Sequence, residues 1–455
     1  MTIICTLPSK EINSMLLEFT CSNYRSIKDK ITFSMIAGKD TTAEDTLIMY
    51  DKFRVLRSSA IYGANGSGKS TFVDAIHFVR SLVLNSINHQ PGQGIFQLPN
   101  KLLSVDQDST FTIQFVKDQT RYAFGFTVNK MLISDEYLYY FPRGRQVVIY
   151  ERDENNFYPG DRFKGKFESC KDVLKPNRLF FSCAANFSAV PEIESAYAFF
   201  RDDLVVYRGL GTDDWMNYSL NTISQDPRTK ELVIDFLHNL GTGIKDIEIN
   251  KTSKAVDPAV IPPFLSDEFK AFLTTNEVDV FDTRIVYDKF SVELQYESTG
   301  IRKLIEFVCP LVDILRKGKV LICDEMEASF HESIVYGIVS LFKIPDSANS
   351  SQIIFTTHDT SILDLNLFRR DQIWFTELTK DNRSTDLYSL AEIKNVRKDE
   401  NVGKGYISGK YGAIPMLNAN LANIVSQEEN DISEEKSNRS SVRSNPRDCR
   451  ERSYR

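Results

Sequence analysis

The stretch GANGSGKS, Gly63 to Ser70, has the residue types and spacing needed to bind a phosphate chain. It satisfies the pattern G-x-x-x-x-G-K-[ST] between an apolar, strand-like run over 53–62 and a helical pattern over 70–87. Glycines in such a loop let backbone N–H groups surround phosphates, and the start of the following helix adds partial positive charge. We expect Lys69 to reach the β and γ phosphates and Ser70 to bind Mg²⁺. The expected nucleotide contacts are Gly63, Asn65, Gly66, Ser67, Gly68, Lys69, Ser70 and Thr71.

An apolar run that ends in two acids, KVLICDE over 319–325, supplies carboxylates that such a site requires. We expect Asp324 to hold Mg²⁺, directly or through its water shell. Glu325 is placed to polarise the attacking water, as a general base or a water-positioning carboxylate. The alternative is a strand whose last acids only face solvent, and the phosphate loop upstream disfavours it.

A second apolar run, IIFTTHD over 353–359, ends in threonines and a histidine. Ligands bind at the carboxyl edge of a parallel sheet, so we expect His358 to contact the γ-phosphate. A histidine with a purely structural role is the alternative, which this position disfavours.

The segment YESTGIRK over 296–303 opens a long amphipathic helix that leads to the run ending at Glu325. A serine, a glycine and a helix N-terminus together form a second phosphate-binding end that has no lysine of its own. Ser298 and Gly300 would therefore need a nucleotide supplied by another phosphate loop. Ser298 is also a candidate N-cap of the helix, a role that is compatible with the first.

Outside these motifs, the pattern changes several times along the chain. Residues 95–185 contain short alternating runs typical of an antiparallel sheet, and 190–285 favour helices. We divide the chain into an N-terminal extension (1–15), the first part of a nucleotide-binding core with a β-rich arm (16–189), a helical lobe (190–290), the second part of the core (291–425) and a charged tail (426–455). The tail is expected to be disordered. Met15 is a candidate start of translation.

The composition narrows the class of protein. The 455 residues are 42% hydrophobic and carry a formal charge of -7, so tight coating of nucleic acid is disfavoured. The seven cysteines form no C-x-x-C pair, which fits reduced thiols. There is no run of about 18 apolar residues and no signal-peptide pattern, so we expect a soluble cytoplasmic protein with no membrane partner.

Together these motifs resemble the ABC-type ATPases of the SMC, RecF and OLD kind. Asn23-Tyr-Arg25-Ser26 is similar to their N-terminal "NFRS" segment, GANGSGKS to Walker A, ESTGIRK to the signature motif, LICDE to Walker B and TTHD to the switch histidine. The sequences DEMEASFHE and YISGKYGAIP (406–415) resemble the AAA-family ATPases of bacterial anti-phage systems (RloA, the AbiL ATPase, AriA of PARIS). The resemblance implies an α/β P-loop NTPase fold with a mixed sheet, an antiparallel β-rich arm and a helical lobe.

The resemblance also implies how the residues work. Two subunits would close head to tail around two ATP molecules, so that Ser298 and Gly300 of one meet the γ-phosphate held by Lys69 of the other. Glu325 would activate water and His358 would sense the phosphate, while Asn23 and Arg25 would lie near the nucleotide. Gln97 and Gln114 remain open as candidates for the glutamine that usually links magnesium to the substrate lobe. The chain has no long heptad arm between its Walker motifs.

In proteins of this branch, the ATPase commonly works beside a Toprim or RloB-type effector nuclease that it restrains until infection is sensed. The resemblance therefore implies a sensor and scaffold in abortive infection, with a phage-encoded trigger. The alternative is a RecF-like clamp that holds duplex DNA. Its candidate contacts are basic residues of the β-rich arm and tail, for which a solvated surface is favoured: Arg143, Arg145, Arg162, Lys164, Lys166 and the arginines from Arg439 to Arg455.

Overall fold

The structure is a computed structural model, and it describes residues 12–102, 107–154, 156–209, 213–255, 277–344, 350–379, 381, 383–397 and 400–415. All of the described helices and strands lie in one unit, Met1–Ile414. Residues 1–11 and the predicted tail, 426–455, lie outside the described residues. Among the described helices, none is both long and apolar enough to cross a membrane. The five described cysteines are buried free thiols, as the spacing predicted.

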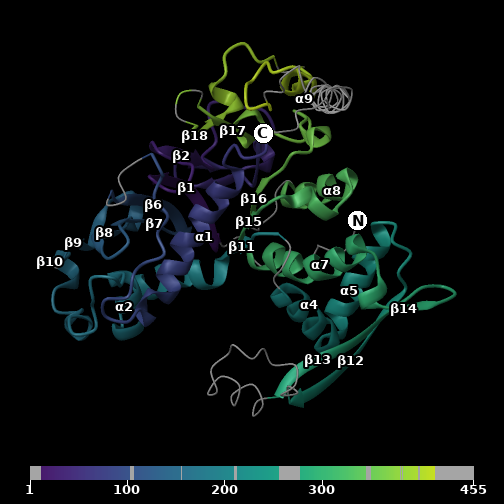
Figure 1. Ribbon diagram of the computed structural model, residues 1–455, viewed down its shortest axis with the longest axis horizontal. Coiled ribbons are helices and arrows are strands. Elements are labelled where there is room, and N and C mark those ends of the chain that lie inside the picture. The colour runs from purple at the N-terminus through teal and green to yellow at the C-terminus, as the bar shows by residue number, and fades with distance from the viewer. Residues whose placement is uncertain are drawn as a thin grey trace, which may run out of the picture. The chain divides into compact units, whose positions relative to one another are not determined.

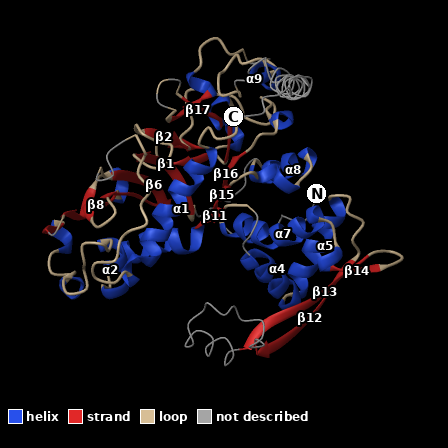
Figure 2. Ribbon diagram, in the orientation of Figure 1, coloured by secondary structure: helices blue, strands red, loops and turns tan. Residues whose placement is uncertain are grey.

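The central sheet has six strands in the order β11-β15-β16-β5-β17-β18, and it is parallel except for the last pair. Figures 1 and 2 label β11, β15, β16 and β17 of this sheet. Its strands are β5 (Ser58–Gly63), β11 (Leu204–Tyr207), β15 (Val320–Cys323), β16 (Gln352–Thr356), β17 (Ile373–Leu378) and β18 (Thr385–Ser389). Strands β15, β16 and β5 are buried along their whole length, as expected for parallel strands covered on both faces. Because β5 pairs with β16, which pairs with β15, the loops after these three strands meet at one edge.

The second sheet is antiparallel and has seven strands in the order β10-β9-β8-β7-β6-β1-β2. Its strands are β1 (Ser14–Ser22), β2 (Ile31–Ser34), β6 (Ser109–Lys117), β7 (Thr120–Val128), β8 (Ile133–Tyr140), β9 (Val147–Asp153) and β10 (Asn156–Pro159). Helix α1 (Lys69–Asn85) joins the two sheets, because its Phe72 ring contacts Phe19 of β1 and Phe33 of β2 in a core that also includes Ile61 of β5. The predicted β-rich arm and the α/β class are confirmed. The predicted extension is shorter than expected, since Ser14 and Met15 lie in β1.

Residues 190–290, which we expected to form a helical lobe, contain strands as well as helices. Helix α3 (Pro191–Ala198) packs with α2 (Phe180–Phe187) in the core of the antiparallel sheet, and β11 belongs to the central sheet. Among the described residues of this range, α4 (Asp213–Gln225) and α5 (Pro227–Asn239) are helices of a separate lobe. The same lobe contains a long hairpin of β12 (Asp246–Ala255) and β13 (Glu277–Val286) with the short β14 (Ser291–Glu293). Ile247 and Ile285 lie in the lobe's core, but β12 has only two large apolar residues, Ile247 and Ile249, so its alternation is too short for a strong strand signal.

Helix α7 (Thr299–Lys317) connects this lobe to the central sheet. Its Leu304, Ile305 and Val308 lie in the lobe's core, while Phe307 and Leu311 lie in the core beneath the central sheet. The helix continues through Pro310, ends at Gly318 with φ 66° and leads directly into β15. The same core beneath the sheet includes residues of α8 (Glu332–Phe342) and α9 (Val402–Ile407).

Candidate nucleotide-binding site

The phosphate loop follows β5 and is held against β17 and β18. Ser67 Oγ lies 2.6 Å from Thr376 Oγ1, and Thr385 Oγ1 donates a 2.9 Å hydrogen bond to the Ser67 carbonyl oxygen. A Cβ added at Gly63 would lie 2.4 Å from Thr376 Oγ1, and one at Gly68 would lie 2.1 Å from Thr385 Oγ1. Gly68 also has φ +112°, which side chains rarely adopt. The glycines of the motif are therefore required by packing and by backbone conformation.

Lys69 begins α1, and its ammonium group lies inside the loop. Nζ donates to the carbonyl oxygens of Gly63, at 2.8 Å, and Ala64, at 3.2 Å. The side chain is 5% exposed, and burial lowers its pKa to about 8, although nearby carboxylates of Glu327, Asp324 and Glu325 raise it in part. A buried cation held among carbonyl groups at a helix start is arranged to bind an anion of high charge.

The two acids after β15 are fixed by Thr356 at the end of β16. Thr356 Oγ1 donates to Asp324 Oδ1 at 2.5 Å and accepts from the Glu325 N–H at 2.8 Å. Glu325 is exposed and has φ 47° and ψ 58°, a left-handed conformation that is strained for a glutamate. Such strain is characteristic of functional sites. Here it occurs between Asp324, whose carboxylate is held by Thr356, and the next segment of the chain, and Glu325 itself stays exposed.

His358 follows β16 and meets the phosphate loop. Its Nδ1 lies 3.4 Å from Lys69 Nζ, so that Nδ1 accepts from the ammonium when the ring proton is on Nε2. The pKa of His358 is lowered, first by desolvation and then by the charge of Lys69, and therefore the neutral ring is favoured. The structure thus brings together Lys69, His358 and the acids that follow β15.

Glu327 is a site residue that sequence reasoning missed. Its Oε1 accepts a hydrogen bond from the main-chain N–H of His358, and its charge acts on Lys69 more strongly than that of Asp324 or Glu325. The sequence signal was a third acid, two residues after Glu325, in DEMEASF. Its importance depends on a contact between loops 31 residues apart, which no local pattern reveals.

The signature residues form the exposed N-terminus of α7. Ser298 Oγ accepts from the Ile301 N–H at 3.2 Å, so the predicted N-cap is present. Ser298 and Thr299 are exposed, and Gly300 is half-buried. No hydrogen bond or ion pair of these described residues connects them with the phosphate loop of the same chain.

The other predicted residues are placed differently. The Asn23 side chain is buried and donates to the carbonyls of Gln107 and Asp108, at 2.9 and 3.0 Å, so it supports the backbone rather than facing a ligand. Arg25 pairs with Asp74 on α1. Of the two glutamine candidates, Gln97 is buried and donates to Ser109, while Gln114 donates to Glu18 in the antiparallel sheet.

The remaining loop residues differ in their contacts. Thr71 Oγ1 lies 3.0 Å from Ser26 Oγ, beside the Asn23–Arg25 turn. Asn65, Gly66 and Ser70 are exposed, so they are accessible to a ligand. No group of three or more His, Cys, Asp or Glu suited to a metal exists among the described residues. The expected Mg²⁺ site does not require such a group, because Ser70 and Asp324 would share the ion with phosphate oxygens of the nucleotide.

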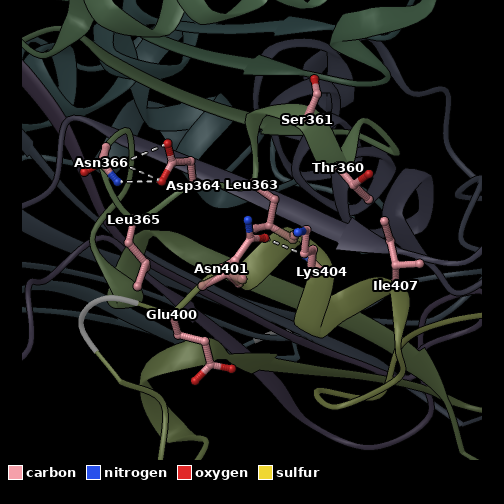
Figure 3. Close-up of a pocket in the computed structure, with 12 residues that line it drawn as sticks. Thr360, Ser361, Leu363, Asp364, Leu365, Asn366, Glu400, Asn401, Lys404 and Ile407 are labelled. Carbon is pink, nitrogen blue, oxygen red and sulfur yellow. Dashed lines mark hydrogen bonds between the residues drawn. The ribbon is translucent and has the colours of Figure 1, made fainter.

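A cavity of about 500 Å³ is lined by residues of the segment 360–366, which follows His358 in the chain, and by residues of 400–407, which include α9. Figure 3 shows Thr360, Ser361 and Leu363 of that segment near Asn401, Lys404 and Ile407. Its lining contains none of the phosphate-loop or Walker B residues, so it is distinct from the candidate nucleotide site.

Comparison with known proteins identifies the family of domains to which the chain belongs. No curated protein matches the chain. Among solved structures, the chain is similar to the SMC head domain from Thermotoga maritima, at 11% identity over 82% of this chain and 98% of that chain, with a TM-score of 0.38. It is also similar to an SMC head bound to the C-winged helix domain of ScpA, at 13% identity over 84% and 99%, with a TM-score of 0.41. A family model described as "AAA domain, putative AbiEii toxin, Type IV TA system" matches residues 58–164 and 225–364, more than half of the chain. The chain belongs to this family of AAA domains.

Proposed function

We propose that the protein binds and hydrolyses ATP with Mg²⁺ at the edge where β5, β15 and β16 end. The observation that supports this most directly is the position of Lys69. Its ammonium contacts the loop carbonyls of Gly63 and Ala64 and lies 3.4 Å from His358 Nδ1, beside the acids that follow β15. A triphosphate in the loop would replace these weak partners with charge-assisted hydrogen bonds.

Each residue at this edge has a proposed role. Lys69 holds the β and γ phosphates, and Ser70 with Asp324 holds Mg²⁺, which would neutralise phosphate charge and orient the γ-phosphate. Glu325 orients or deprotonates the attacking water, and its exposure leaves its carboxylate free to do so. His358, held as a neutral ring, contacts the γ-phosphate. Arg25 remains a proposed neighbour of the nucleotide, whereas the buried amide of Asn23 supports the turn that carries it.

We further propose that two copies bind head to tail around two ATP molecules. The capped, exposed N-terminus of α7 offers free N–H groups and positive charge, which suit a phosphate. Since Ser298 and Gly300 make no described contact with their own phosphate loop, the γ-phosphate they bind is the one held by a second copy. ATP is then part of the dimer interface, and hydrolysis weakens it.

In the cell, we propose a cytoplasmic sensor and scaffold of an anti-phage, abortive-infection system that restrains a Toprim or RloB-type effector nuclease until a phage-encoded trigger appears. This rests on the resemblance of DEMEASFHE and YISGKYGAIP to such ATPases and agrees with a family described by a toxin of a toxin–antitoxin system. Of the candidate DNA contacts in the β-rich arm, Lys164 pairs with Asp161 and Arg162 donates to the Tyr140 hydroxyl, while Arg143, Arg145 and Lys166 are exposed, which fits the solvated surface favoured above.

The first test is release of phosphate from ATP by the purified protein, compared with Lys69→Ala. Magnesium-dependent turnover that Lys69→Ala abolishes supports the proposal, and turnover that survives this substitution contradicts it. Copurification of a second polypeptide with no ATP-dependent binding to duplex DNA supports the scaffold. Salt-sensitive DNA binding that ATP strengthens supports the clamp instead.

A further inference from the structure

Glu327 lies at the candidate site, yet none of the roles above uses it. It belongs to the short helical segment Met326–Ser329, and its Oε1 accepts a hydrogen bond from the main-chain N–H of His358. This contact joins the loop after β15 to the loop after β16. The position of the switch histidine therefore depends on the side chain of Glu327.

The second carboxylate oxygen of Glu327 is not satisfied. Oε2 is buried and has no hydrogen-bond partner among the described residues. A buried acceptor without a partner costs about 1–3 kcal/mol, and more when it is charged. Such an atom in a ligand-binding site indicates a donor that arrives with the ligand.

The surroundings of Glu327 indicate which ligand brings that donor. Among the carboxylates, Glu327 has the largest effect in raising the pKa values of both Lys69 and His358, so its charge lies close to both. Yet it forms no described ion pair with Lys69, whose ammonium bonds instead to Gly63 and Ala64. The Glu327 carboxylate thus lies near the lysine that is expected to hold the γ-phosphate, and it forms no described ion pair with that lysine.

We propose that Glu327 is a positioning residue of the hydrolysis site: one oxygen fixes the main chain of the switch histidine, and the other accepts a hydrogen bond from a water bound with the magnesium nucleotide. This inference rests on the proposed ATPase function. Phosphate oxygens cannot be that partner, because they and the carboxylate are both acceptors. A water molecule bound to the metal ion donates a hydrogen bond, and the nearby positive charge of the ion favours a negatively charged acceptor such as Oε2.

Three variants separate the two roles. Glu327→Gln keeps an oxygen for the His358 N–H but removes the charge and the second acceptor. Glu327→Ala removes both contacts. Glu332→Gln is the matched control, because Glu332 is exposed at the start of α8, five residues along the chain. For each, the dissociation constant of a fluorescent ATP analogue is measured with Mg²⁺ and with EDTA, and kcat is measured with saturating ATP. Thermal melting identifies any variant that is unfolded.

In the parent, Mg²⁺ should tighten binding of the analogue. For Glu327→Gln, the ratio of the dissociation constant in EDTA to that in Mg²⁺ is expected to be at least about threefold smaller than for the parent. The dissociation constant in EDTA should be unchanged. The kcat of Glu327→Gln should fall about tenfold or more. The kcat of Glu327→Ala should fall further, because the main-chain N–H of His358 also loses its hydrogen bond to Glu327. Glu332→Gln should match the parent in both measurements.

A Glu327→Gln protein with the parental magnesium gain and the parental kcat would overturn the inference while leaving the ATPase function intact. Equal kcat values for the Gln variant and a folded Ala variant would overturn the role of Oε1. A parent protein that neither binds nor hydrolyses ATP would overturn the proposed function itself, which distinguishes the two failures.

Discussion

The main-chain N–H of Asp324 donates a 2.8 Å hydrogen bond to the main-chain carbonyl oxygen of Tyr207. The Tyr207 hydroxyl accepts from Lys303 and donates to Glu306 at 3.1 Å, and both of these residues lie on α7. Lys303 and Glu306 are also paired, at 3.0 Å, and all three side chains are buried. One tyrosine thus connects the proposed magnesium-binding acid with the helix that carries the signature.

Replacing Tyr207 with Phe tests this connection. The change leaves the buried Lys303–Glu306 pair without the hydroxyl, so we expect a loss of about 1–3 kcal/mol in the free energy of unfolding. Urea unfolding measures it, with Tyr336→Phe as the control because Tyr336 is 47% exposed on α8. If Tyr207→Phe is as stable as Tyr336→Phe, the Tyr207 hydroxyl does not stabilise the contact between β11 and α7.

Lys69 should destabilise the protein in the absence of nucleotide. Burial lowers its pKa from 10.5 to about 8, so the unfolded chain binds more protons between these values and stability falls as the pH falls through this window. At pH 7, Lys69→Met is therefore expected to raise the free energy of unfolding by about 1–3 kcal/mol. The gain should shrink as the pH approaches 10.5.

Urea unfolding at several pH values, without nucleotide, measures this difference. Lys289→Met is the control, because Lys289 is exposed. A Lys69→Met protein that is less stable than the parent at pH 7 would contradict the expected cost of burying this cation.

The glycines of the phosphate loop should differ in their tolerance of alanine. A Cβ at Gly66 meets nothing within 4 Å, whereas one at Gly68 overlaps Thr385. Both have positive φ, so Gly66→Ala is expected to cost about 1 kcal/mol and Gly68→Ala at least about 2 kcal/mol. Thermal unfolding ranks the two, and equal losses would show that the contact with β18 is unimportant.

Glu325→Gln should separate ATP binding from hydrolysis. The amide cannot accept the proton of the attacking water, so we expect the single-turnover rate to fall about a hundredfold or more. The dissociation constant for ATP should change by less than about threefold. A parental rate would show that another group activates the water.

The sequence predicted the parts of the molecule whose signals are local. The phosphate loop, the helix after it, the buried strands β15 and β16 and the capped start of α7 all follow from spacing or periodicity within a short window. The β12–β13 hairpin was missed because β12 has only two large apolar residues, Ile247 and Ile249, which is too short an alternation to predict a strand. Glu327 and Tyr207 could not be assigned, since their roles arise from partners about 31 and 100 residues away. The role of Asn23 was also not predictable, because its amide bonds to backbone brought close by folding.

The central claim, that two copies share each ATP, is tested by mixing two inactive variants. Lys69→Ala lacks a working phosphate loop, and Ser298→Arg lacks a working signature. In a head-to-tail pair of one copy of each, one of the two sites combines the intact Lys69 with the intact Ser298. We predict that each variant alone is inactive and that an equal mixture recovers roughly a quarter of the parental ATPase rate. A mixture that stays as inactive as its components, or a Ser298→Arg protein with the parental rate, would contradict the claim.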